Sequence, residues 1–588
     1  MKWTNFNIKL AGDDITHLFA ELQLEQAISN HHYFTIRLPS DDSLPMFKNT
    51  LKTSSEKWLG EIVEIENCFK GVITSLALSR AKTGGSEFLI RGQSISILAD
   101  DALVFKSFGK KPLTKIVDEA FSSYTGKIDM ESNPGYTKEL KYCVQNAESN
   151  FDFLNRLAAR YGEWFFYNGH KLIFGKLPES EPVRLDFAYD LNYFDISLNA
   201  VPVNFKIIAY DYKNHNAPPT KNSEYSDLQN PFAKVALDKS KGEIFGNKFD
   251  MPIQISMDDA DLDQIKTLKQ NLNIARLAVL SGTSTNFNLG IGKIIEVVDS
   301  RKGLLVGGLE NYGKYVITRL HHSVSTHGDD YTNTFDAVPL DVVVPPTQIS
   351  PDPPACQPLF GEVKENNDPK KLGRIRVQFS WQKPLKGDDS MTPWIRVSSP
   401  MASGDKGFYM VPEKGDQVIV AFEQNHPEKP YVLIPGMYHG EAKPQYFDDN
   451  NYKKAIKTKG GNLILMHDED KKQSMALSSP VDFSGTATDG KMDFKAKKVI
   501  TIISDEEEIK IKAPKKITIE ADDIEINGAK SVKINGKMID IVADMSLTEK
   551  ATTVSIEGSA STDVKGNGKM NVESAGITTV TGSMLKLN

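Results

Sequence analysis

Residues 498–588 repeat a motif of eight residues, and this repeat limits the possible folds more than any other feature of the chain. Read in eights from Lys498, the segments begin KVITIISD, EEEIKIKA and PKKITIEA and later include VSIEGSAS, TDVKGNGK and MNVESAGI. The β-branched positions include Ile524, Val532, Ile556, Val564, Val572 and Val580, and glycine follows two residues later at Gly558, Gly566 and Gly582. The segments that begin at Met538 and Ser546 drift out of phase.

A segment of eight residues cannot enclose a core by itself. It supplies one or two β-branched side chains and a glycine where the chain must turn sharply. Its strand needs neighbours on both edges, because its backbone N–H and C=O groups otherwise stay unpaired. Three chains wound together close a narrow prism without free edges, whereas a single chain with three octads per turn is the competing geometry. The oligomeric state separates these hypotheses. Eleven octads would make a rod of roughly 50 Å.

The whole chain, at 588 residues, is too long for one hydrophobic core. Residues 1–180 predict an α+β domain, residues 181–345 a β-rich domain with an inserted helix, and residues 346–358 a linker. Residues 359–440 predict a small barrel, residues 441–497 a β connector and residues 498–588 the repeat region. Six prolines from Pro345 to Pro358 support the linker, since proline neither continues a helix nor donates to a sheet. The fold class is therefore mainly β and multidomain.

Local patterns predict three helices. Pro112 begins the first, because proline suits a first helical turn. Its apolar side is formed by Ile116, Val117, Ala120, Phe121 and Tyr124. In the second, Ser149 and Asp152 resemble a capping box, and Phe153, Leu157 and Tyr161 follow at helical spacing. The third, inserted in the β-rich domain, is marked by Ile265, Leu268, Leu272 and Val279.

Strands are predicted on both sides of the linker. Residues 164–167 form a strand, Asn168-Gly169 supplies a tight hairpin turn, and residues 171–174 return. Residues 294–298 and 315–317 predict later strands. In the small barrel, Ile375, Val377 and Phe379 alternate with polar residues, and residues 394–397 and 418–422 predict two further strands.

Composition excludes several classes of protein. A net charge of −7 argues against a general nucleic-acid coat. Three distant cysteines, Cys68, Cys143 and Cys356, argue against a disulfide framework and a zinc cluster. The start, MKWTNFNIKLAGDD, lacks an apolar segment of the signal-peptide type, and no apolar run is long enough to span a bilayer. We therefore expect synthesis in the cytoplasm and no cleaved leader.

Candidate catalytic and metal-binding residues are few. His31-His32 and His321-His322 are adjacent pairs, and neighbouring side chains on a strand point to opposite faces, so ordinary strand or loop histidines are expected. The carboxylates at 506–508 and at Asp522-Asp523 fall at octad corners, where charges normally face water. No GxSxG, HExxH or phosphate-binding loop occurs in a supporting context. The sequence predicts neither an enzyme nor a bound cofactor.

Four stretches in order resemble the VgrG family of type VI secretion spikes and the related hub and needle proteins of contractile phage tails. Residues 143–174 resemble the hub signature, with a CVQ-like strand before an FDFLxRLAxxxG helix. The stretches GRIRVQFSW, PWIRVSSPMA and GFYMVPEKGDQVIVAFEQNHPEKP resemble the family's OB-fold module. The matched residues there are Gly373, Arg374, Val377, Phe379, Trp381, Trp394, Arg396, Val397, Gly415, Asp416, Pro427 and Pro430. Lys459-Gly460-Gly461-Asn462 resembles the segment that leads into the β-helix, and the Val-x-Gly octads resemble the spike.

The resemblance implies a function that is mechanical. It implies two hub domains, an OB-fold barrel and an intertwined triple-stranded β-helix, assembled as a homotrimer on an Hcp-type tube within a baseplate. Contraction of the sheath would drive the spike through a target membrane and so secrete it, with effectors and a PAAR-type tip protein. The interval 441–497 has no room for the lysozyme domain of phage needles, and we expect no toxin domain after the spike. A spike of an extracellular contractile particle is the alternative within this class.

Two further hypotheses concern particular residues. The barrel carries Lys370, Lys371, Arg374, Arg376, Trp381, Trp394 and Arg396, a mixture of basic and aromatic residues that a single-stranded nucleic-acid platform requires. We expect instead that the tryptophans pack the barrel and that the arginines face a neighbouring subunit, with no nucleic acid bound. At the C-terminus, Met584, Leu585, Lys586, Leu587 and Asn588 would form the platform that binds the tip protein.

Overall fold

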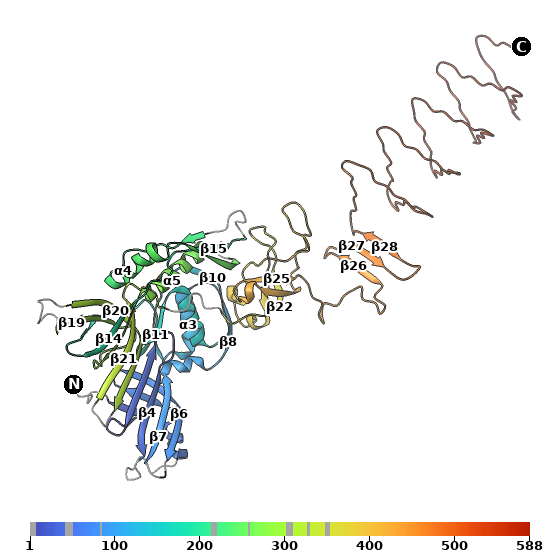
Figure 1. Ribbon diagram of the computed structural model, residues 1–588. Coiled ribbons are helices and arrows are strands. Elements are labelled where there is room, and N and C mark those ends of the chain that lie inside the picture. The colour runs from blue at the N-terminus through green and yellow to red at the C-terminus, as the bar shows by residue number, and fades with distance from the viewer. Residues whose placement is uncertain are drawn as a thin grey trace. The chain divides into compact units, whose positions relative to one another are not determined.

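The computed structural model describes residues 7–40, 51–66, 68–80, 82, 85–212, 220–256, 259–301, 310–325, 330–346 and 353–587. It divides the chain into two units, Met1–Leu477 and Ser478–Asn588, which are treated separately below (Figure 1). Residues 347–352 of the predicted linker lie outside the described residues.

A curled sheet of 13 strands dominates the first unit (Figure 1). Its strands are β1 (Ile8–Leu10), β2 (Asp13–Asp14), β3 (Glu21–Ala27), β4 (Tyr33–Ser40), β5 (Ile62–Ile65), β6 (Phe69–Arg80), β7 (Ser86–Ser94), β13 (Val183–Asp186), β14 (Leu191–Leu198), β18 (Ala278–Ser284), β19 (Ile294–Asp299), β20 (Glu310–Ser325) and β21 (Asp330–Pro339). β20 pairs with β3 in antiparallel register, Leu320 opposite Gln26 and His322 opposite Leu24. The sheet therefore takes strands from both sides of residue 180, and the division there into two domains stays a prediction.

Three helices pack on the first half of the sheet region: α1 (Leu51–Trp58), α2 (Leu113–Phe121) and α3 (Asn150–Tyr161). Pro112 is the residue before α2 rather than its first residue, and the predicted apolar side from Ile116 to Phe121 is buried. β8 (Val104–Pro112) and β10 (Glu139–Glu148) form a two-stranded ribbon, and β9 (Asp129–Asn133), β11 (Trp164–Tyr167) and β12 (Lys171–Gly175) form a small sheet. β11 and β12 are the predicted hairpin, and Gly169 in its turn has φ of 100°.

A smaller layer contains α4 (Pro231–Lys239), α5 (Asp259–Leu277), β15 (Phe205–Tyr210), β16 (Thr220–Asn222) and β17 (Phe249–Ser256). The predicted inserted helix is α5, but Val279 was assigned to it wrongly. The helix ends at Leu277, and Val279 lies in β18, opposite Ser197 of β14. Strand pairing thus overrides the helical spacing of Val279.

Residues 359–434, which we call the OB module, contain a four-stranded sheet with strand order β23-β22-β24-β25. The strands are β22 (Leu359–Glu365), β23 (Arg376–Phe379), β24 (Gln417–Phe422) and β25 (Pro430–Ile434). Ile375, Val377 and Phe379 are buried in its core, as predicted. The predicted strand at 394–397 is wrong: Ile395 and Val397 form isolated bridges to Ile375 and Val432, two different partners. No ladder extends along this segment, and Pro393 before it lacks an N–H donor.

After the OB module, β26 (Lys453–Lys457), β27 (Leu463–His467) and β28 (Ser474–Ser478) form a three-stranded sheet. The Lys459-Gly460-Gly461-Asn462 segment makes the turn between β26 and β27, where Gly461 N–H donates to Thr458 O and Gly461 has φ of 93°. A positive φ of this kind favours glycine.

The second unit is a regular zigzag of extended arms separated by bends (Figure 1). Bends recur at 514–515, 522, 529–530, 537, 544–545, 552, 559–560, 567–568 and 575–576. Two-residue and one-residue bends alternate as far as 552, so the equivalent positions Ile509, Ile524, Ile539 and Val554 are fifteen residues apart. The drift at Met538 and Ser546 is therefore an alternation of steps of eight and seven residues. From Val554 onward the step is eight.

Candidate functional site

Helix α3 carries the first candidate site, a cluster of buried charges. The Ser149 side chain accepts a hydrogen bond from Asp152 N–H at 3.0 Å and caps the start of the helix, and Gly162, with φ of 76°, ends it. Between these caps, Arg156 and Arg160 are four residues apart and lie on one face of the helix. Arg156 donates from Nε to Glu148 Oε1 at 2.6 Å and from Nη2 to Glu148 Oε2 at 2.8 Å.

The same two arginines hold a carboxylate that comes from the OB module. Glu428 precedes β25, and Arg160 Nη1 pairs with its Oε2. Arg156 Nη1 lies 3.7 Å from Glu428 Oε1, and Val144 N–H donates to that oxygen at 3.2 Å. Burial raises the pKa of Glu428, but the positive charges of Arg160 and Arg156 outweigh burial and lower it to about 2. We call Glu148, Arg156, Arg160 and Glu428 the junction cluster.

Contacts of the β8–β10 ribbon join the OB module at a second place. Asp389 accepts hydrogen bonds from Lys111 Nζ at 2.6 Å and from Gly109 N–H at 2.8 Å. Gln382 donates to Ser107 Oγ at 2.8 Å. A side chain at Gly109 would collide with the backbone of Asp388, since a Cβ there would come within 2.5 Å of Asp388 O. The OB module is therefore fixed to the β8–β10 ribbon by directional contacts that are buried or partly buried.

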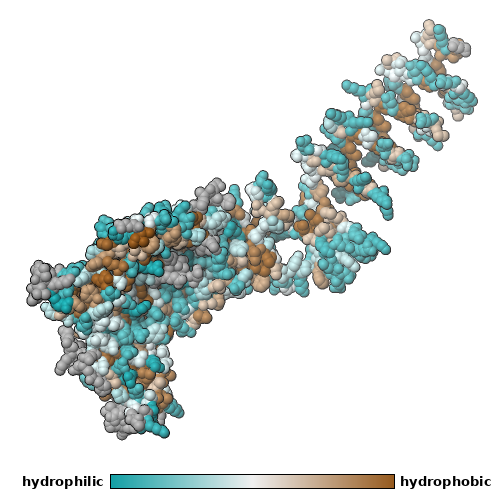
Figure 2. Space-filling view, in the orientation of Figure 1, coloured by the Kyte–Doolittle hydropathy of each residue, from teal (hydrophilic) through white to brown (hydrophobic). Residues whose placement is uncertain are grey.

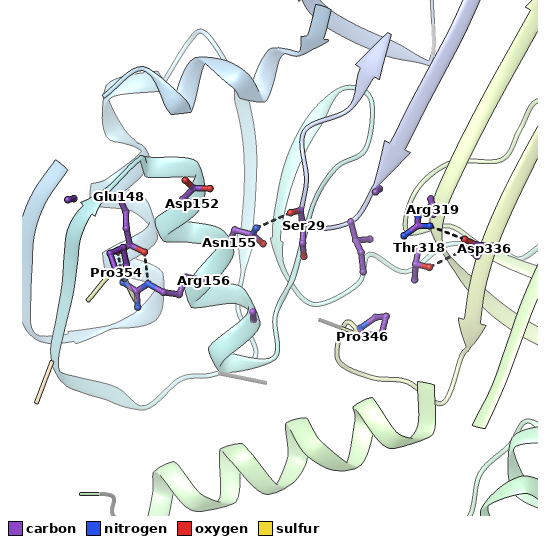
Figure 3. A pocket seen from close by; sticks show the side chains of 14 residues that line it. Ser29, Glu148, Asp152, Asn155, Arg156, Thr318, Arg319, Asp336, Pro346 and Pro354 are labelled. Atoms are coloured by element: carbon purple, nitrogen blue, oxygen red, sulfur yellow. Dashed lines mark hydrogen bonds and ion pairs between the residues drawn. The ribbon is translucent and has the colours of Figure 1, made fainter. Parts of the chain in front are cut away.

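Beside the junction cluster lies an open cavity of about 730 Å³ (Figure 3). The polar side chains around it are largely engaged with one another: Glu148 with Arg156, Asn155 with Ser29 O at 2.9 Å, and Arg319 with Asp336 at 3.6 Å. Among the described residues that line it there is neither histidine nor cysteine.

His31 has different partners from His32 and His322. His31 contacts Ser96 Oγ at 2.8 Å and Asp100 Oδ2 at 2.9 Å. His322 contacts Tyr331 OH at 2.7 Å and Gln26 Oε1 at 3.2 Å, and the Gln26 amide nitrogen lies 3.2 Å from His32 Nδ1. Burial lowers the pKa of His32 to about 3 and that of His322 to about 4. Among the residues that the structure describes, no group of three histidine, cysteine or acidic side chains is placed to hold a metal ion.

Three arginines of the OB module pair with carboxylates of the same chain. Arg374 makes a bidentate pair with Asp368, at 2.9 and 2.8 Å. Arg376 pairs with Asp388 at 2.7 Å, and Arg396 pairs with Glu423 at 2.6 Å. Carboxylates of the same chain neutralise these arginines, and the expectation that they face a neighbouring subunit stays a prediction. Lys370 and Lys371 are exposed, and Trp381 packs against the module's core beside Phe379.

The arms of the second unit are the second candidate site. Every described residue from 480 to 587 is exposed, including apolar side chains such as Ile556, Val564 and Val572, which are 68–72% exposed. No backbone hydrogen bond joins two described residues of this stretch. Figure 2 shows hydrophobic residues gathered along the middle of the arms and hydrophilic residues towards the bends. The carboxylates at 506–508, Asp522 and Asp523 are exposed at bends or beside them.

At the end of the second unit, Met584, Leu585 and Leu587 are 80%, 59% and 85% exposed, and Lys586 is exposed beside them. Asn588 lies outside the described residues. In the described part of the chain, no helix is both long enough and apolar enough to cross a bilayer.

Two family models match the chain, one before the predicted linker and one after it. One, described as "Phage tail baseplate hub (GPD)", matches residues 63–328. The other, described as "Type VI secretion system/phage-baseplate injector OB domain", matches residues 359–438. The chain belongs to the VgrG-type family of type VI spike and phage baseplate hub proteins. In this VgrG-type chain the junction cluster joins the hub match to the OB match.

Curated relatives carry names of the same kind. The chain is 24% identical over 373 residues to "Actin cross-linking toxin VgrG1" of Vibrio cholerae, which covers 59% of this chain and 33% of that protein. It is 22% identical over 372 residues to "Type VI secretion system spike protein VgrG1c" of Pseudomonas aeruginosa, covering 58% of this chain and 49% of the relative. These matches thus span half or less of the length of the relatives.

Solved structures show the same fold at low identity. A chain of the "PdpA-VgrG Complex, Lidless" aligns with a TM-score of 0.51 and 10% identity, over 81% of this chain and 98% of that chain. A chain of the lidded Francisella PdpA-VgrG complex aligns with a TM-score of 0.50 and 10% identity, over 81% and 80% of the two chains. These likenesses show that this VgrG-type chain shares the fold of the two solved chains.

Sequence reasoning missed the junction cluster. Arg156 and Arg160 lie within the hub signature, and Glu428 lies between Pro427 and Pro430 in the OB stretch, but nothing in their spacing pairs them. The available signal was indirect: two arginines on one face of an otherwise apolar helix require buried acceptors.

Proposed function

We propose that three copies of this chain form the hub and spike of a type VI secretion apparatus, and that sheath contraction drives this spike through a target membrane. The observation that carries the proposal is the state of residues 480–587, which expose β-branched side chains and form no backbone–backbone hydrogen bonds with one another. Unpaired backbone and exposed apolar surface on this scale need other chains to cover them.

The arrangement of the arms favours the trimer over the single-chain coil. A coil with three octads per turn would pair each arm with another arm of the same chain and bury its apolar face. In the described arms no such pairing occurs, and their apolar residues stay exposed. Three copies related by a threefold axis would instead supply partners for both edges of each arm.

Partners follow from the same proposal. The hub would sit on an Hcp-type tube within the baseplate, and residues 584–588 would bind a PAAR-type tip protein. Effectors would travel on the spike, and the assembled protein would leave the cytoplasm by contraction. A tip site is supported by the exposed apolar Met584, Leu585 and Leu587. The domains at 1–180, 181–345, 359–440, 441–497 and 498–588 remain part of this proposal.

The deciding measurement is the mass of the full chain in solution. Multi-angle light scattering at low micromolar concentration should give about three times 65.4 kDa. A stable monomer with full β content would contradict the proposal and support the single-chain coil. A search of the neighbouring genes for sheath, tube and ATPase genes separates a type VI apparatus from an extracellular contractile particle.

A further inference from the structure

The arms between residues 509 and 541 share a pattern of charge as well as of apolar residues. Each arm has two apolar residues separated by one polar residue: Ile509-Lys510-Ile511, Ile517-Thr518-Ile519, Ile524-Glu525-Ile526, Val532-Lys533-Ile534 and Ile539-Asp540-Ile541. The first apolar residue of each pair is 49–54% exposed and the second is 63–71% exposed. The central residues therefore read Lys, Thr, Glu, Lys and Asp along the chain.

In an extended arm, successive side chains point to opposite faces. The central residue of each arm consequently lies on the face opposite its two apolar neighbours. If other copies cover the apolar faces, as the proposed trimer requires, Glu525, Lys533 and Asp540 remain on the outer face. In the described chain, neither Lys533 nor Asp540 is within ion-pair distance of an opposite charge, and Glu525 accepts a hydrogen bond from the nearby Asn527 amide.

The trimer determines which arms become neighbours. Each copy rises by one strand spacing, about 4.8 Å, per arm. The three copies share each face, so an arm is flanked by the preceding and the following arm of other copies. The central residue of one arm faces the central residue of the next, whichever way the neighbouring arm runs. Cross-strand neighbours at this spacing interact directly.

We propose that Lys533 lies between Glu525 and Asp540 of neighbouring copies, and that this charge ladder sets the register of the three chains. The inference rests on the proposed trimer and adds the surface that aligns it. The apolar residues alone do not fix the register, because the arms carry nearly interchangeable Ile and Val pairs. A slip of one arm would place Lys533 beside the same lysine of another copy. A slip of two arms in the direction that replaces the arm of Glu525 by that of Lys510 would place Lys533 beside another lysine.

Charge reversal in the full chain tests the ladder. Lys533→Glu should lower the temperature at which light scattering loses the trimer by roughly 5 °C, because attraction becomes repulsion on both sides of each copy. Lys533→Gln should lower it by less. The triple variant Glu525→Lys, Lys533→Glu and Asp540→Lys, which reverses every charge of the ladder, should recover most of the loss. In 1 M NaCl the differences should shrink, since salt screens exposed charges.

Lys537→Glu is the matched control, because it makes the same change of charge at a bend four residues away. It should leave the trimer as stable as the unaltered chain. Equal losses for Lys533→Glu and Lys537→Glu, or no recovery in the triple variant, would overturn the ladder while leaving the trimer intact. An unaltered chain that is monomeric would instead overturn the proposed function itself.

Discussion

Arg160 of helix α3 and Glu428 of the OB module form a buried ion pair although 268 residues separate them in the sequence. Their side chains are 16% and 3% exposed. Arg156, one turn earlier on the same helix, lies beside the same carboxylate and is itself held by Glu148. The hub match and the OB match of this VgrG-type chain therefore meet at a cluster of buried charged side chains. Such a cluster is stable only while every member keeps its partner.

Replacing Glu428 with alanine should destabilise the first unit by about 3–5 kcal/mol, because Arg156 and Arg160 stay buried while a shared counter-charge is lost. Val144 N–H also loses its acceptor. Equilibrium denaturation in urea measures the free energy of unfolding. Glu413→Ala in the same module is the control, since Glu413 is exposed and its nearest ion-pair partner, Lys459, is 3.8 Å away. Similar unfolding curves for the two variants would show that the junction cluster contributes little to stability.

Acid should weaken the hub in a window set by its buried histidines. His32 and His322 have pKa values lowered by burial to about 3 and about 4, whereas an unfolded histidine titrates near 6.5. Between these values the unfolded chain binds more protons than the folded chain, so stability rises with pH and falls as pH drops from 6.5 towards 4. The free energy of unfolding, measured in urea at successive pH values, should show this slope.

His322→Gln should flatten part of that slope, because glutamine does not titrate. His170→Gln, at an exposed histidine, is the control and should leave the slope unchanged. Glu428 acts in a lower window: its pKa is lowered to about 2 from 4.5, so its contribution is complete above pH 4.5 and disappears as pH falls through 2. A slope that His322→Gln does not alter would mean that His322 does not remain neutral in the folded hub.

The sequence predicted elements whose signals are local. The capped helix α3, the Asn168-Gly169 hairpin and the alternation in β23 each lie within about a dozen residues, and the structure contains all three. Val279 shows where local signals fail. Its helical spacing continues past Leu277, but the residue lies in a strand because it pairs with β14. Residues 394–397 likewise had strand composition, but their partners lie in two different segments.

Long-range pairing was beyond the sequence. Nothing local indicates that β20 pairs with β3, or that Glu428 reaches α3. The octad period holds from Val554 onward, whereas the earlier arms alternate between steps of eight and seven residues, which explains the drift near Met538. In each of these cases the structure depends on which distant residues pair with one another, and not on the local preference of the sequence for helix or strand.

Val572→Asp should abolish the trimer. In the separate chain Val572 is 71% exposed, so a carboxylate there costs little until other copies cover it. In the closed prism three carboxylates would be buried close together without partners. Asn571→Asp is the control, because it places the same charge on the adjacent residue, which faces the opposite side of the arm. Light scattering gives the oligomeric state. A Val572→Asp trimer with the melting temperature of the unaltered chain would refute the buried apolar face.

The C-terminal platform gives the last prediction. Three copies would bring together three sets of Met584, Leu585 and Leu587, which are 59–85% exposed in the chain, at the blunt end of the prism. Open strand edges beside clustered apolar side chains favour binding of another protein. Deleting residues 583–588 should therefore leave the trimer intact but abolish binding of a PAAR-type tip protein in a pulldown, and should abolish secretion.

Side-chain replacement tests whether the tip protein needs the apolar side chains themselves or only the full length of the chain. Replacing Met584, Leu585 and Leu587 with serine should lose the tip protein as completely as the deletion does, because the apolar surface is gone while the backbone remains. Lys586→Ser, within the same segment, should retain binding. If the shortened trimer binds the tip protein as well as the full chain, the tip protein docks elsewhere and the exposed apolar residues of the C-terminus have another role.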